Sequence, residues 1–72
     1  MAMKMLLIII EKTNTGFSAY VPDLPGCIAS GETKGETEQN MAEAIRFHIE
    51  GMELEGLPIP DSSTESEMMV LV

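Results

Sequence analysis

The chain has 72 residues, enough for one small domain that buries only about 60–65 % of the surface of its unfolded state. Cys27 is the only cysteine and His48 the only histidine, which excludes an intrachain disulfide and leaves too few ligands for a structural zinc site. The net charge of −8 disfavours nucleic-acid binding by this chain alone and would attract a basic partner, although it also serves solubility. Association with other chains remains as the way to stabilise so small a core, and we expect an oligomer.

The first predicted element is a strand from Met3 to Ile10, which is apolar on both faces from Met5 onward and should therefore be covered on both. Its apolar run resembles the core of a signal peptide, but the run is short, and Glu11 and Lys12 follow at once with no small-residue cleavage site. No stretch reaches the roughly 20 apolar residues that a membrane helix needs. We expect a cytoplasmic protein without a membrane segment, which a single thiol also suits.

A hairpin and two further strands are expected next. Asn14 and Gly16 can take positive φ, which is typical of a hairpin turn, and Phe17–Val21 is the return strand. The Pro25–Gly26 pair suits the two central positions of a type II turn. The short run Cys27–Ser30, made mainly of small residues, predicts the third strand.

A helix is predicted to begin at Thr33, which can form a capping box with Glu36 three residues later. Gly56 is the predicted C-cap, and Pro58 prevents the helix from continuing. The polar run Asp61–Glu67 predicts a flexible connection. The apolar stripe of the helix, read at a spacing of 3.6 residues, consists of Met41, Ile45, His48, Ile49 and Met52.

The last predicted strand is Met68–Val72, which is apolar at every position. The expected fold is α+β, a three-stranded antiparallel meander followed by one helix and a fourth strand that joins the sheet (β-β-β-α-β). One helix covers only one face of such a sheet, so the second apolar face needs cover from elsewhere. A second copy could supply it through the last strand. The predicted oligomer interface is therefore Met68, Met69, Val70, Leu71 and Val72.

Several short motifs follow one another between Gly16 and Pro60. They are GFSAYVPDLPGC, the GET before the helix, Asn40 and Ala44–Ile45 within it, and EGLPIP after it. In this order and spacing they resemble the HicB antitoxin family, and the resemblance covers most of the chain. It implies a partial ribonuclease-H-like sheet with the strand order three-two-one-four. HicB proteins are the inhibitory halves of toxin–antitoxin pairs, so it also implies an antitoxin that masks a small, basic, messenger-RNA-cleaving HicA-like toxin.

Many HicB proteins carry a DNA-binding domain after this region, whereas this chain stops at Val72. We therefore expect a short form with a single HicB-like domain, residues 1–72, that does not bind operator DNA by itself. The alternative function is that of an orphan HicB-like protein, which forms a small oligomeric assembly or binds a ligand and has no toxin partner.

An enzyme is disfavoured. Ribonuclease H enzymes hold two metal ions on clustered carboxylates, but the first predicted strand has no acidic residue. Cys27 and His48 could serve as nucleophile and base, yet no family motif surrounds Cys27, and packing explains both residues better. We expect no cofactor and no metal. The predicted toxin contacts are the carboxylates near the turns and the helix start, Asp23, Glu32 and Glu36, although an aspartate in a turn also suits local hydrogen bonding.

Overall fold

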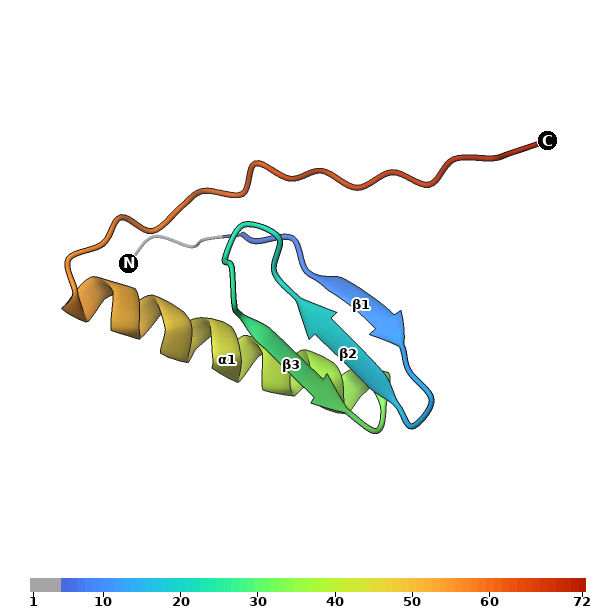
Figure 1. Cartoon of the computed structure of the whole chain (residues 1–72), viewed down its shortest axis with the longest axis horizontal. Helices are drawn as coiled ribbons and strands as arrows, with labels where there is room; N and C mark the ends of the chain where they lie inside the picture. Colours follow the sequence, from blue (N-terminus) through green and yellow to red (C-terminus); the bar gives the residue numbers. More distant parts are fainter. Residues whose placement is uncertain (1–4) are drawn as a thin grey trace.

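The computed structural model describes residues 5–72. Three strands, β1 (Ile9–Lys12), β2 (Phe17–Tyr20) and β3 (Ile28–Gly31), precede a long helix, α1 (Lys34–Leu54). The strands pair antiparallel in the order β1-β2-β3, and α1 crosses one face of the sheet, mainly over β3 and β2 (Figure 1). The predicted α+β class and the three-stranded meander are therefore confirmed.

The hairpin between β1 and β2 is closed by local hydrogen bonds. The Thr13 N–H donates to the Gly16 carbonyl (2.8 Å), and the Gly16 N–H donates to Thr13 Oγ1 (3.0 Å). Neither Asn14 nor Gly16 has a positive φ, so the prediction of a left-handed conformation in this turn is wrong. Gly16 is required for space instead, because a Cβ there would collide with the carbonyl oxygen of Gly31 on β3.

The connection from β2 to β3 contains the predicted type II turn. The Cys27 N–H donates to the Leu24 carbonyl (3.1 Å), Pro25 occupies the second position, and Gly26 has a φ of +84° at the third. Leu24, at the first position, is only 1 % exposed. The turn therefore contributes a side chain to the core as well as reversing the chain.

The helix begins where it was predicted to begin. Thr33 Oγ1 accepts from the Glu36 N–H (3.0 Å), as in a capping box. The Glu36 carboxylate, however, accepts from the N–H of Glu32 (3.4 Å) and so reaches one residue further back than the standard motif. The buried Thr37 hydroxyl donates to the Thr33 carbonyl (2.8 Å), which satisfies its polar atom.

The helix also ends as predicted. Gly56 has a φ of +71° and donates its N–H to the Glu53 carbonyl (3.1 Å), while the Leu57 N–H donates to the Met52 carbonyl (2.9 Å). This is the Schellman arrangement, in which a glycine takes the left-handed conformation that other residues disfavour.

The core lies between the sheet and α1. Its fully buried apolar residues are Ala19, Val21, Leu24, Cys27 and Met41. The partly buried residues packed around them are Leu6, Ile8, Ile10, Ala29, Ala44, Ile45, Ile49 and Met52. The predicted helix stripe is therefore confirmed, with Met41 as its most buried residue and His48 half-buried.

The first strand is shorter and later than predicted. The range Met3–Ile10 overlaps β1 only at Ile9 and Ile10; Met3 lies outside the described residues, and residues 5–8 belong to no strand. Leu6 and Ile8 in the apolar run still pack against the core, whereas Ile9 and Ile10 at its end pair with β2.

The predicted fourth strand, Met68–Val72, is not a strand in the structure. The segment is extended, it runs away from the sheet (Figure 1), and each of its five side chains is at least 74 % exposed. The apolar composition indicates a capacity to form a strand, but pairing requires a neighbouring edge, and the single chain does not bring this segment to one.

Candidate functional site

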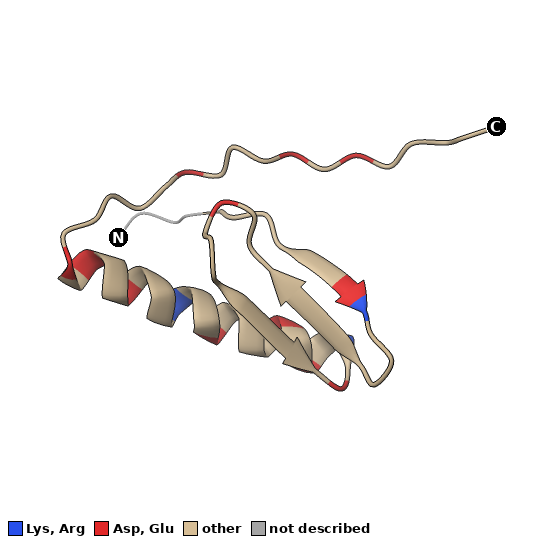
Figure 2. Ribbon diagram, in the orientation of Figure 1, with Lys and Arg blue, Asp and Glu red and all other residues tan. Residues whose placement is uncertain are grey.

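Acidic residues dominate the surface of the described chain. Figure 2 shows Asp and Glu along α1, in the turns and along the C-terminal segment. The cationic residues within the described part of the chain are Lys12, Lys34 and Arg46. Such a surface attracts cationic groups and repels phosphate.

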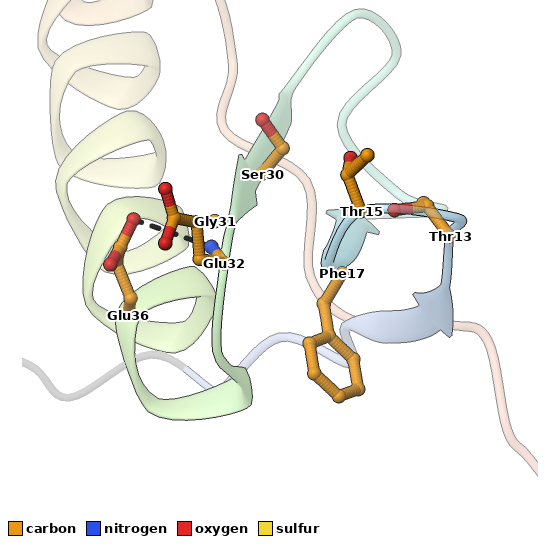
Figure 3. A pocket seen from close by; sticks show the side chains of 7 residues that line it. All are labelled: Thr13, Thr15, Phe17, Ser30, Gly31, Glu32 and Glu36. Carbon is orange, nitrogen blue, oxygen red and sulfur yellow. Dashed lines mark hydrogen bonds between the residues drawn. The ribbon is translucent and has the colours of Figure 1, made fainter.

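One hollow of about 370 Å³ lies where the β1–β2 hairpin meets the end of β3 and the start of α1. Its lining residues are Thr13, Thr15, Phe17, Ser30, Gly31, Glu32 and Glu36. Figure 3 shows Glu32 and Glu36 on the helix side, with Thr13, Thr15 and Phe17 on the hairpin side. Two of the three predicted contact carboxylates, Glu32 and Glu36, are therefore brought together here.

Local structure positions these two carboxylates. Glu36 lies in the first turn of α1 and is held by its bond to the Glu32 N–H, and Gly31, which precedes Glu32, also lines the hollow. Carboxylates form short, strong hydrogen bonds with guanidinium and ammonium groups, and an aromatic ring such as Phe17 also attracts a cation. The arrangement suits an arginine or lysine side chain from a partner.

Asp23 lies elsewhere. It follows β2, whereas the hollow lies at the start of β2, so the two are at opposite ends of the sheet (Figure 1). Its carboxylate accepts from Ser63 Oγ and Thr64 Oγ1 (both 3.0 Å) and from the Ser63 N–H (3.2 Å). Weaker contacts come from the Thr64 N–H and Ser62 Oγ (both 3.4 Å). The interpretation of Asp23 as a local turn acceptor is wrong, because its partners lie about forty residues further along the chain.

These contacts alter the acidity of Asp23. Desolvation acts to raise the pKa of the carboxyl, but the hydrogen bonds from Thr64 and Ser63 outweigh it and leave the pKa below its ordinary value. Ser62–Thr64, predicted as part of a flexible connection, is therefore anchored to the β2–β3 turn. Three successive hydroxyl residues were the available signal, but nothing in the sequence indicates which carboxylate they would meet.

The other candidate chemistry finds little support. Cys27 is buried in the core, and burial raises the pKa of its thiol, which disfavours the thiolate that a nucleophile needs. Within residues 5–72 no three His, Cys, Asp or Glu side chains are grouped so that they could hold a metal ion. Over the same residues, no helix has both the length and the apolar character that crossing a membrane requires.

The sequence matches the family of HicB-like antitoxins of bacterial toxin–antitoxin systems over residues 6–70. Because the match extends over nearly all of the described residues, the chain belongs to this family. The resemblance drawn from the motifs between Gly16 and Pro60 is thereby confirmed.

Two relatives and two solved structures illustrate the match. An uncharacterized 14.9 kDa protein from the rep–hol intergenic region of Haemophilus phage HP1 is 48 % identical over 56 residues, 78 % of this chain and 42 % of that protein. A UPF0150 protein of Thermoplasma acidophilum is 38 % identical over 63 residues, 88 % of this chain and 91 % of that one.

The fold is similar to that of a chain in the HicA3 and HicB3 toxin–antitoxin complex, with a TM-score of 0.67 and 39 % identity over 88 % of this chain and 72 % of the other. It is also similar to the crystal structure of antitoxin HicB3, with a TM-score of 0.68 and 40 % identity over 81 % of this chain and 43 % of that one. The chain thus spans less than half of the phage protein and of that HicB3 chain, but most of the Thermoplasma protein.

Proposed function

We propose that this chain is an antitoxin that binds a small, basic, HicA-like RNA-cleaving toxin and neutralises it by covering its surface. The observation that carries the proposal is the 39 % identity to a chain of a solved toxin–antitoxin complex. The net charge of −8 supports it, since opposite charges speed the association of two proteins and favour the correct partner.

The proposed contact is centred on Glu32 and Glu36 in the hollow beside Phe17. A cationic side chain of the toxin would meet two carboxylates there without displacing any core residue. Asp23 is the third proposed contact, but its carboxylate already accepts from the C-terminal segment at the other end of the sheet. It contributes only if the toxin contact extends along the whole sheet.

The double substitution Glu32→Gln, Glu36→Gln tests this contact. It removes two charges at nearly constant size, and an amide oxygen at position 36 can still accept from the Glu32 N–H. We expect co-expression of the wild-type chain with a small, basic, HicA-like toxin to restore the growth of cells that express this toxin. The double substitution should weaken the complex about tenfold or more, because two charge-assisted hydrogen bonds are lost.

The matched control is Glu43→Gln, Glu53→Gln, which removes the same charge from exposed positions further along α1. It should leave the affinity within a few fold of the wild type. Equal weakening by both pairs would show that charge acts at long range and that the hollow is not the contact. If the wild-type chain neither restores growth nor forms a complex, the antitoxin proposal fails and the orphan function replaces it.

The ribonuclease-H-like arrangement is part of the same proposal. The order β1-β2-β3 corresponds to three neighbouring strands of the order three-two-one-four, which leaves the outer side of β1 for a fourth strand. Met68–Val72 has the composition of that strand. We expect it to pair only in an assembly, where another chain covers its apolar side chains.

A further inference from the structure

We propose that Met68–Val72 forms the fourth strand in trans, so that the segment of each copy adds to the outer edge of β1 in a second copy. The product is a two-fold dimer in which two chains exchange C-terminal strands. This inference develops the oligomer expected from the sequence and does not depend on toxin binding.

The C-terminal segment has the properties of a strand without a sheet. Its five consecutive apolar residues are extended, and the least exposed of them, Met69, is 74 % exposed. Soluble proteins avoid contiguous apolar surface of this kind unless another surface covers it. Because the side chains are apolar at both parities, a partner must cover both faces, as happens inside a sheet.

β1 provides a complementary edge. Within the described sheet β1 has one neighbour, β2, so its other side is available for pairing. The chain leading into β1 is apolar, with Leu6 and Ile8 on the core side and Met5 83 % exposed. β1 has four residues and the C-terminal segment five, so the two match in length. A strand at this position would extend the sheet on the side of β1 that faces away from β2.

The anchor at Asp23 explains why a second copy, and not the same chain, supplies the strand. Ser63 and Thr64 are held at the β2–β3 turn by hydrogen bonds of 3.0 Å. From this anchor the chain continues away from its own sheet (Figure 1). The apolar segment and the open edge therefore belong to one molecule without meeting in it. When two copies exchange their C-terminal segments, each segment meets the β1 edge of the other copy. This contact has two-fold symmetry and is closed, so no further copies add to it.

Cross-linking between variants that each carry one added cysteine, besides the buried Cys27, tests the exchange. Val70→Cys and Leu71→Cys place a thiol on opposite faces of the segment, and Glu11→Cys places one on exposed β1. Each C-terminal variant is refolded together with Glu11→Cys, one of the two carrying a tag, and treated with a short bismaleimide. We expect a covalent mixed dimer with at least one of the two C-terminal positions, and little product from any variant alone.

The controls use the same chemistry. The wild-type chain should not react, because Cys27 is buried, and Glu55→Cys at the end of α1 should not cross-link to the C-terminal variants. Self-cross-linking of Val70→Cys or Leu71→Cys would mean that the C-terminal segments pair with each other, which overturns the exchange but not self-association. An intramolecular bridge in the double variant Glu11→Cys, Val70→Cys would place the strand in cis and also overturn it.

Light scattering at micromolar concentration gives an independent measurement. The wild-type chain should have twice its mass of 7.8 kDa, and Val70→Glu should shift it to the monomer. Ser66→Glu adds the same charge just before the apolar segment and should remain dimeric. A wild-type monomer would overturn both the exchange and self-association, even if toxin binding is intact. If Met68–Val72 cross-linked only to the toxin, the toxin would be the partner of this segment, and the exchange would likewise be overturned.

Discussion

At the scale of single residues, two glycines determine how closely the hairpin, β3 and α1 approach one another. A Cβ on Gly16 would meet the backbone of Gly31, and a Cβ on Gly31 would lie 2.8 Å from Thr37 Oγ1 and 2.9 Å from its nitrogen. Real side chains do not tolerate such distances without displacement of their neighbours. The end of the sheet that carries the hollow is thus packed through backbone contacts that only glycine permits.

We therefore expect Gly31→Ala to destabilise the chain by roughly 1–3 kcal/mol, because the methyl group overpacks against Thr37. Gly51→Ala is the matched control: it lies within α1, a Cβ there meets nothing within 4 Å, and it should stabilise by about 0.5–1 kcal/mol. Urea unfolding followed by circular dichroism, at one protein concentration, measures both. Unfolding of Gly31→Ala at the same urea concentration as the wild type would contradict the close packing of β3 on α1.

At the scale of elements, side-chain to backbone bonds join segments that are distant in sequence. Asn40 on α1 donates through Nδ2 to the carbonyl of Ser30 on β3 (2.8 Å), which links the helix to an edge of the sheet. Asp23 joins the β2–β3 turn to the C-terminal segment through Ser63 and Thr64. The second link determines where the apolar segment leaves the molecule.

The anchoring of the C-terminal segment should depend on pH. Because the pKa of Asp23 is lowered in the folded chain, the stabilisation is fully present above the ordinary value of 3.8 and is lost as the pH falls through the lower folded value. An NMR titration that follows the Thr64 amide should give a midpoint below 3.8. Asp23→Asn should abolish this transition, and Glu67→Gln, on the same segment, should not. A midpoint at or above 3.8 would show that the anchor does not form in solution.

At the scale of the whole molecule, charge and exposed apolar surface define the interactions open to this chain. Twelve acidic residues against four basic ones produce a field that favours basic proteins over nucleic acid. The hollow with Glu32 and Glu36 and the apolar segment Met68–Val72 lie in different parts of the fold. Toxin binding and self-association can therefore use separate surfaces.

We accordingly expect no sequence-specific DNA binding by this chain alone. In a gel shift at physiological salt, DNA from upstream of its gene should migrate unchanged, because the protein would have to approach phosphates of the same sign. Unrelated DNA of equal length is the control. A band that depends on the upstream sequence and weakens with added salt would contradict this expectation.

Much of the local structure was predictable because it depends on neighbouring residues. The type II turn follows from Pro25–Gly26, and the helix boundaries follow from Thr33 and Gly56, since caps and turns are decided within a few residues. The helix stripe follows from its spacing. The candidate site was predictable in part, because Glu32 and Glu36 lie on either side of the N-cap residue Thr33 and the cap holds them near each other.

Contacts between distant segments were decided only by the tertiary structure. The sequence by itself determined the order of three strands and a helix, the buried stripe and the apolar character of Met68–Val72. It did not determine that Asp23 would bind Ser63 and Thr64, that Gly16 would serve close approach to Gly31, or that the last segment would lie outside the sheet. Local preferences depend on adjacent residues, whereas these outcomes depend on which surfaces the folded chain brings within bonding distance.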